Sequence, residues 1–184
     1  AATAVAQAVQ RQLVVPFDNV SREAQTYWLS EASAVILTDD LIALGAPAIT
    51  REDRVRAFER LRVPVSSTLS HATVIRLGQL VGAATAVVGS VQVKGQDLIV
   101  RARSIRIDAG RMAPEIVESG PLASVFDVYA RIARRMVPGS GVTSEQLEQA
   151  HAVVAEQQEL FDHGGRHLLV GLRSARERHS HEFQ

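Results

Sequence analysis

Two stretches of the sequence decide the fold: LVVPFDN at residues 13–19 and AVVGSVQVKGQDL at residues 86–98. The first is a short apolar run that fits a strand buried on both faces. Pro16 cannot donate to a strand ladder and belongs at the strand end, and Asp18-Asn19 then favours a turn. The second stretch predicts a hairpin of two strands, at 84–93 and 98–108.

Helical patterns fill the chain between these two stretches. A long helix is expected over residues 24–44, because its apolar residues repeat at helical spacing and form one buried stripe: Ala34, Leu37, Leu41 and Leu44. A short strand is expected at 48–50. Thr50 then caps a second helix, and Ser70 caps a third that ends at Gly82.

The chain after the hairpin predicts one more strand and one more helix. Residues 112–119 are expected to form a strand at the sheet edge, since Pro114 interrupts it. The helix that follows carries a cluster of cations in its last turns, where they complement the helix dipole: Arg131, Arg134 and Arg135. The complete order predicts an α/β (α+β) fold, a mixed five-stranded sheet packed with helices, plus a C-terminal helix.

The second strand of the hairpin changes its apolar face partway along. The apolar positions fall first on even-numbered residues, from Leu98 to Ala102, and then on odd-numbered ones, at Ile105 and Ile107. A strict alternation does not place both sets on one face. We therefore expect a bulge or a sharp twist near Ser104.

The chain divides into three parts. Residues 1–12 read either as a helix or as the remnant of an export signal, because Ala4-Val5-Ala6 has the small-x-small form of a signal-peptidase site. Residues 13–137 are expected to form the α/β domain. Residues 138–184 are expected to form a linker, a helix and a polar tail. That helix has a narrow apolar seam suited to docking on another helix: Leu147, Ala150, Val154 and Phe161.

The composition excludes several classes of site. The 184 residues carry a formal net charge of +0, so no overall field attracts nucleic acid or an anionic membrane. There is no cysteine, which excludes disulfides and thiolate sites. No apolar run approaches the roughly 20 residues of a membrane-spanning helix, so no span is expected.

The sequence matches no common catalytic or cofactor template. Lys94 is not followed by a hydroxyl residue, so there is no P-loop, and no G-x-G-x-x-G follows the first strand. Gly89-Ser90 lies within a strand pattern and not at the strand-to-helix turn of a serine hydrolase. His163 and His167 have metal-ligand spacing, but Gly164-Gly165 between them disfavours a helix there. We expect neither an enzyme nor a bound cofactor or metal.

Three arginines of the hairpin are candidates for a binding surface: Arg101, Arg103 and Arg106. A basic stripe of this kind can track a phosphate backbone. Nucleic-acid-binding sheets usually also offer aromatic residues for stacking, and the strands of this half contain none. The favoured interpretation is a solvated sheet face or an edge protected from aggregation.

Five ordered motifs resemble the TolB amino-terminal-like domain. They are VVPFDN at 14–19, YWLSE at 27–31, ITR at 49–51, VGSV at 88–91 followed by Gly95, and IDAG at 107–110. They resemble, in turn, the family's opening strand, its second signature, its second strand with an arginine, its glycine-serine hairpin and its closing turn. The CsgG-like and FlgO-like domains share this anticodon-binding-domain-like layout. The resemblance covers about residues 13–136, and no tetratricopeptide spacing or propeller follows Val142.

The resemblance implies a non-catalytic domain of the bacterial cell envelope, periplasmic or exported, that acts through protein contacts. The partners we expect are envelope proteins, or a second copy docked through the C-terminal helix. We expect contacts at the seam helix and at an exposed sheet edge, to which a partner strand adds. The alternative is a cytoplasmic regulatory domain that binds nucleic acid or a small ligand on the arginine face.

Overall fold

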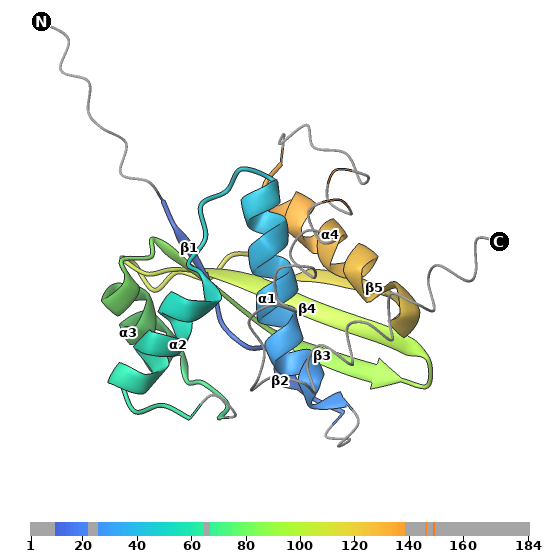
Figure 1. Cartoon of the computed structure of the whole chain (residues 1–184), viewed down its shortest axis with the longest axis horizontal. Helices are drawn as coiled ribbons and strands as arrows, with labels where there is room; N and C mark the ends of the chain where they lie inside the picture. Colours follow the sequence, from blue (N-terminus) through green and yellow to red (C-terminus); the bar gives the residue numbers. More distant parts are fainter. Residues whose placement is uncertain (1–9, 22–25, 65–66, 139–145, 147–148, 150–184) are drawn as a thin grey trace, which may run out of the picture.

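A five-stranded mixed sheet forms the centre of the domain (Figure 1). The computed structural model describes residues 10–21, 26–64, 67–138, 146 and 149. The strands run in the order β1-β3-β4-β5, and β2 also pairs with β3. Their bounds are β1 Gln12–Val14, β2 Asp18–Asn19, β3 Thr85–Lys94, β4 Asp97–Arg106 and β5 Ile116–Pro121. Strands β1 and β2 are parallel to β3, while β4 lies between β3 and β5 and is antiparallel to both. The predicted fold class is confirmed.

Two short segments differ from the expectation. Asp18-Asn19 is not a turn: it forms β2, with Asp18 opposite Ser90 of β3. Residues 48–50 form no strand and contribute a single bridge, between Ala48 and Gln12. The first difference has a simple cause. The chain passes Pro16 and meets β3 again, so that β2 takes the place beside β3 that a longer β1 would have held.

Within the described residues, four α-helices accompany the sheet: α1 Trp28–Ala43, α2 Arg51–Arg60, α3 His71–Val81 and α4 Val125–Met136, the last preceded by the 3-10 turn η2, Leu122–Ser124. The predicted caps are confirmed. The Thr50 side chain accepts a hydrogen bond from the Asp53 N–H, and Ser70 accepts one from the Thr73 N–H. Helix α3 ends at Gly82, whose φ of 64° is in the left-handed region that favours glycine.

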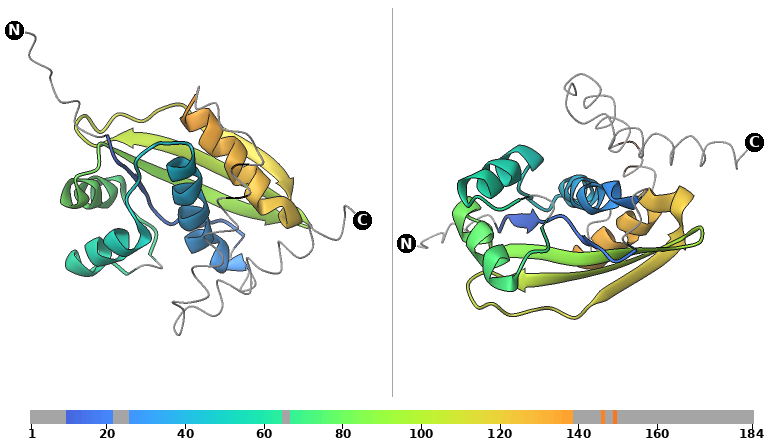
Figure 2. Two further views of the ribbon diagram at one scale, coloured as in Figure 1. Left: turned by 45° about the horizontal axis from the view of Figure 1, so that its top comes forward. Right: turned by 90° about the horizontal axis from the view of Figure 1, so that it is seen from below.

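The helices cover the two faces of the sheet unequally. Figure 2 shows α1 and α4 side by side over one face, with α2 and α3 grouped at the β1 end. The core beneath α1 and α4 includes Val87, Val91, Leu98 and Val100. A second core joins α2 and α3 to the opposite face, at Leu13, Val15, Ala86, Ile105 and Ile107. Strand β1 is therefore buried on both faces, as its apolar run predicts.

The change of apolar face along β4 needs no bulge. The pairing of β3 with β4 is continuous from Thr85 opposite Arg106 to Lys94 opposite Asp97. Leu98 to Ala102 face α1 and α4, whereas Ile105 faces α2 and α3 through ordinary alternation. The expected bulge near Ser104 is wrong. The strand alternates regularly, and its apolar residues change face because α1 and α4 cover one face of the sheet and α2 and α3 cover the other.

The two stretches that decide the fold pack directly against each other. The Phe17 ring lies over Gly89, where a Cβ atom would come within 2.6 Å of the ring and 2.2 Å of the Arg101 carbonyl oxygen. Phe17 also meets Tyr129 of α4, with the ring centroids 6.4 Å apart. Gly89 is therefore required by close approach, since any larger side chain displaces the aromatic contact that fixes α4 above the sheet.

Candidate interaction surface

The sheet face opposite α1 and α4 is half covered and half open. Helices α2 and α3 pack on its β1 end through Ile105 and Ile107. From Arg103 towards the β3–β4 turn and across to β5, no helix of the described residues packs on this face (Figure 2). We call the remainder the open half and define it by Ser90, Gln92, Ile99, Arg101, Arg103, Val117 and Ser119, which the strand registers place side by side. Val117, 40% exposed, is among the most exposed large apolar residues of the part described.

Two of the predicted arginines lie on the open half and share one carboxylate. Arg101 Nη1 is 3.3 Å from Glu115 Oε2, and Arg103 Nη2 is 3.0 Å from Glu115 Oε1. Glu115 comes from the segment just before β5. This arrangement offsets much of the positive charge of the two arginines and holds their guanidinium groups in place.

The third arginine does not join them. In the continuous β3–β4 register, Arg106 has the opposite phase to Arg101 and Arg103, so it lies on the other face. Its Nη2 is 2.7 Å from Asp108 Oδ2, and this hydrogen bond lowers the pKa of the Asp108 carboxyl. The three arginines therefore form no single basic stripe. A phosphate backbone would have to displace Glu115 or Asp108 to reach them.

The outer edge of β5, which pairs with no strand, is occupied by two arginines that were predicted from the sequence to complement the helix dipole. Arg131 Nη2 donates to the Ser119 carbonyl oxygen at 2.7 Å, and Arg135 Nη1 donates to the Val117 carbonyl oxygen at 3.3 Å. Glu118 bridges the two guanidinium groups, at 2.9 Å from Arg131 Nε and 3.0 Å from Arg135 Nη1. The sequence signal for this contact was the four-residue spacing of the two arginines, which puts them on one face of a helix that directly follows an edge strand.

The electrostatics of Glu118 follow from these contacts. Burial by itself raises the pKa of the Glu118 carboxyl, but hydrogen bonds from Arg131 and Arg135 and their charges outweigh that effect. The net result is a lowered pKa. Glu118 therefore stays ionised at neutral pH and holds both arginines against β5.

The main-chain groups at the opposite edge of the sheet are largely paired with neighbouring loop and helix residues. The Gln12 N–H donates to the Pro47 carbonyl oxygen at 2.8 Å, and the Ile49 N–H donates to the Gln12 carbonyl oxygen at 2.8 Å. Further along, the Phe17 N–H donates to the Ser30 carbonyl oxygen, and the Val93 N–H donates to Ser21 Oγ at 2.6 Å. The described part of this edge therefore offers few free partners to another strand.

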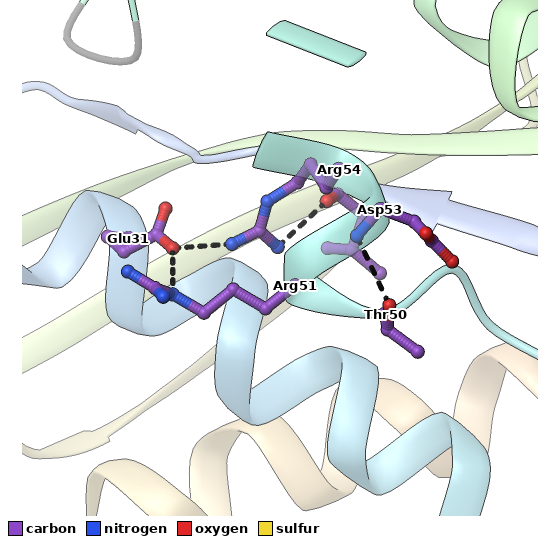
Figure 3. Close-up of polar contacts among 6 residues, drawn as sticks. Glu31, Thr50, Arg51, Asp53 and Arg54 are labelled. Atoms are coloured by element: carbon purple, nitrogen blue, oxygen red, sulfur yellow. Dashed lines mark hydrogen bonds and ion pairs between the residues drawn. The ribbon is translucent and has the colours of Figure 1, made fainter. Parts of the chain in front are cut away.

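A buried arginine joins the helices of the covered end. Arg54 of α2 is 1% exposed, and it donates to Glu31 of α1 and, at 3.3 Å, to the Val14 carbonyl oxygen of β1 (Figure 3). Arg51 approaches the same Glu31 oxygen at 3.0 Å from the surface. Desolvation lowers the pKa of the Arg54 guanidinium, and Glu31 counteracts this effect. The cluster positions α2 against α1 and β1, and the sequence reading did not identify it.

The remaining predicted sites lie elsewhere. The seam residues Leu147, Ala150, Val154 and Phe161 lie outside the described residues, as do His163 and His167. Within the described ranges, no group of three or more His, Asp or Glu side chains is arranged to hold a metal ion. None of the helices described there is long and apolar enough to cross a membrane.

No protein-family model matches the chain, and no curated protein sequence matches it. Solved structures with similarity to it include the LpoB C-terminal domain of Escherichia coli, which is 14% identical, with a TM-score of 0.48 over 61% of this chain and 82% of that one. Lipoprotein GNA1162 of Neisseria meningitidis is 17% identical, with a TM-score of 0.46 over 82% and 96%. TolB of Acinetobacter baumannii is 13% identical, with a TM-score of 0.40 over 78% of this chain and 28% of that one. At values this low, the likenesses assign no function to this chain.

Proposed function

We propose that the chain is a non-catalytic protein-interaction domain of the bacterial cell envelope, and that its partner binds on the open half of the sheet. The envelope setting rests on the resemblance of the ordered sequence motifs to the TolB amino-terminal-like domain. The binding mode rests on one observation: half of the sheet face opposite α1 and α4 has no covering helix among the described residues, while the outer edges are occupied.

The chemistry of the open half suits a protein partner. Ile99 and Val117 supply apolar surface, and Arg101 and Arg103 surround it with donors that Glu115 holds in place. Arginine beside apolar residues is a frequent composition at protein interfaces, and pre-ordered side chains lose less conformational entropy on binding. The occupied outer edge of β5 disfavours the strand addition that the sequence suggested.

Site-specific photo-crosslinking tests the binding surface. A photoreactive residue at Val117, which is 40% exposed, is compared with one at Leu80 of α3, which is 39% exposed and lies outside the open half. In cells that produce the full-length gene product, we expect a discrete protein adduct from position 117 and none from position 80. A second substitution, Ile99→Glu, is expected to abolish that adduct. Equal adducts from both positions, or none from position 117, would contradict the proposal.

Cell fractionation tests the envelope setting separately. The full-length gene product is expected in the periplasmic or membrane fraction and accessible to protease after the outer membrane is permeabilised. Recovery in the cytoplasmic fraction, protected until the inner membrane is broken, would remove the envelope assignment. It would leave the crosslinking result to stand by itself.

A further inference from the structure

We infer that Glu118, Arg131 and Arg135 keep the β5 edge closed against strand addition by a second copy of this chain. We call these three residues the edge guard. The inference does not depend on the proposed function, because it concerns self-association of the purified chain.

The first step is the direction of the main-chain groups of β5. Ile116, Glu118 and Gly120 alternate along the strand with Val117, Ser119 and Pro121. In an antiparallel ladder, the N–H and C=O of one residue point to the same side, and successive residues point to opposite sides. The carbonyl groups of Val117 and Ser119 meet arginines of α4, so this set points away from β4.

The second step is that at each outward position one main-chain group is occupied or missing. The Val117 and Ser119 carbonyl oxygens already accept hydrogen bonds from Arg135 and Arg131. The third outward position is Pro121, which has no N–H to donate. An added strand would therefore have to displace a guanidinium group from each of the two carbonyls before it could pair.

The third step is that the guard is held in place from two directions. Glu118 accepts from both arginines, which sit one helical turn apart on α4, beside β5 in Figure 1. Gly120 lets α4 approach β5 closely, since a Cβ atom there would lie only 3.2 Å from Val128 Cγ2, whereas Arg131 Nη2, at 3.5 Å, would stay at ordinary contact distance. The arginines of α4 are thus joined both to the Glu118 carboxylate and to the main chain of β5.

The partner that an unguarded edge would take is a second β5. Two identical edge strands can pair antiparallel about a two-fold axis, so each copy supplies the same groups. The exposed Val117 side chain would lie on one face of the joined sheets and add apolar contact. A closed edge keeps the wild-type chain from this association.

The test measures self-association of the whole chain by analytical ultracentrifugation over a concentration series. The guard variant is Arg131→Ala/Arg135→Ala, and Glu118→Gln is a milder form that keeps both arginines. The matched control is Arg101→Ala/Arg103→Ala, which loses the same charge from two arginines that also share one glutamate. We expect the guard variant to dimerise at a concentration at least about tenfold lower than the control, because the two carbonyls freed on each copy, four in the dimer, can then accept backbone hydrogen bonds.

A third substitution identifies the strand responsible. Val117→Pro removes an outward N–H of β5 and leaves the ladder to β4 intact, so it should return the guard variant to the monomer. Association that persists with Val117→Pro would overturn the inference, because it would arise elsewhere. An Arg131→Ala/Arg135→Ala chain that keeps its circular dichroism and associates no more than the control would also overturn it. If that variant fails to fold, Glu118→Gln must show the increase, or the inference fails.

Discussion

The two ends of the sheet use the same chemistry with different consequences. At the covered end, Glu31 bridges Arg51 and Arg54, and at the open half Glu115 bridges Arg101 and Arg103. The Arg54 side chain is 2% exposed, whereas those of Arg101 and Arg103 are 49% and 42% exposed. Burial, and not the pairing itself, therefore sets how much an arginine–glutamate cluster contributes to stability.

The physical reason is the cost of an uncompensated charge. Removing one partner of a buried pair leaves the other without water or counterion, which costs several kcal/mol. Exposed pairs are screened by solvent, and either partner is rehydrated when the other is lost. The covered end therefore depends on its cluster for stability, while the open half can change its arginines without unfolding.

The largest effect is expected where the buried pair is broken. Arg54→Ala should lower the free energy of unfolding by about 3 kcal/mol, because it empties a buried site, leaves the Val14 carbonyl without its donor and leaves Glu31 only its exposed partner Arg51. Arg51→Ala removes the exposed partner of the same glutamate and should cost less than about 1 kcal/mol. Urea denaturation of both variants measures the difference. Equal losses would show that burial does not distinguish the two arginines.

The next largest effect is expected in the middle of β3, between the covered end of the sheet and the open half. Gly89→Ala should cost about 2 kcal/mol, because its Cβ atom cannot fit between the Phe17 ring and the Arg101 carbonyl without moving one of them. Ser90→Ala, one residue along on the open half, is the control and should stay within about 0.5 kcal/mol of wild type. A Gly89→Ala chain as stable as the Ser90→Ala chain would mean that the close approach is relaxed at no cost.

The smallest effect is expected at the sheet edge, where it depends on pH. The folded state lowers the pKa of Glu118, so its contribution to stability is complete above the unfolded value of about 4.3 and is lost as the pH falls through the folded value. Glu118→Gln should therefore cost about 1 kcal/mol at neutral pH, and the cost should shrink towards pH 3. Denaturation of both chains between neutral pH and pH 3 measures it. A cost that does not change with pH would exclude the ionised carboxylate as its source.

Local signals in the sequence predicted much of the fold. The caps at Thr50 and Ser70, the hairpin between β3 and β4 and the doubly buried β1 all depend on residues near one another in the chain. The misread parts depended on distant neighbours. Strand β2 forms because β3 lies beside it, and the supposed bulge vanishes once α2 and α3 cover the face opposite α1.

The candidate site was predicted less completely than the fold. The sequence identified Arg101 and Arg103, but their shared carboxylate and the opposite placement of Arg106 required the strand registers. Arg131 and Arg135 were recognised as a cluster, but their contact with the β5 edge was not predicted. Their hydrogen bonds to Ser119 and Val117 span twelve and eighteen residues, and no local pattern indicates which edge strand they reach.

Periodicity, caps and composition act over a few residues, so they were enough to predict the helices, the longer strands and the aliphatic core, but not β2 or the absence of a strand at 48–50. Which sheet face stays open, which edge the arginines occupy and which arginine is buried could be seen only once the chain was folded. Those properties depend on the packing of distant elements, as when Ser33 of α1 meets Tyr129 of α4. One residue type thus has different roles at Arg54, Arg101 and Arg131, because solvent access and neighbouring main chain are set by packing.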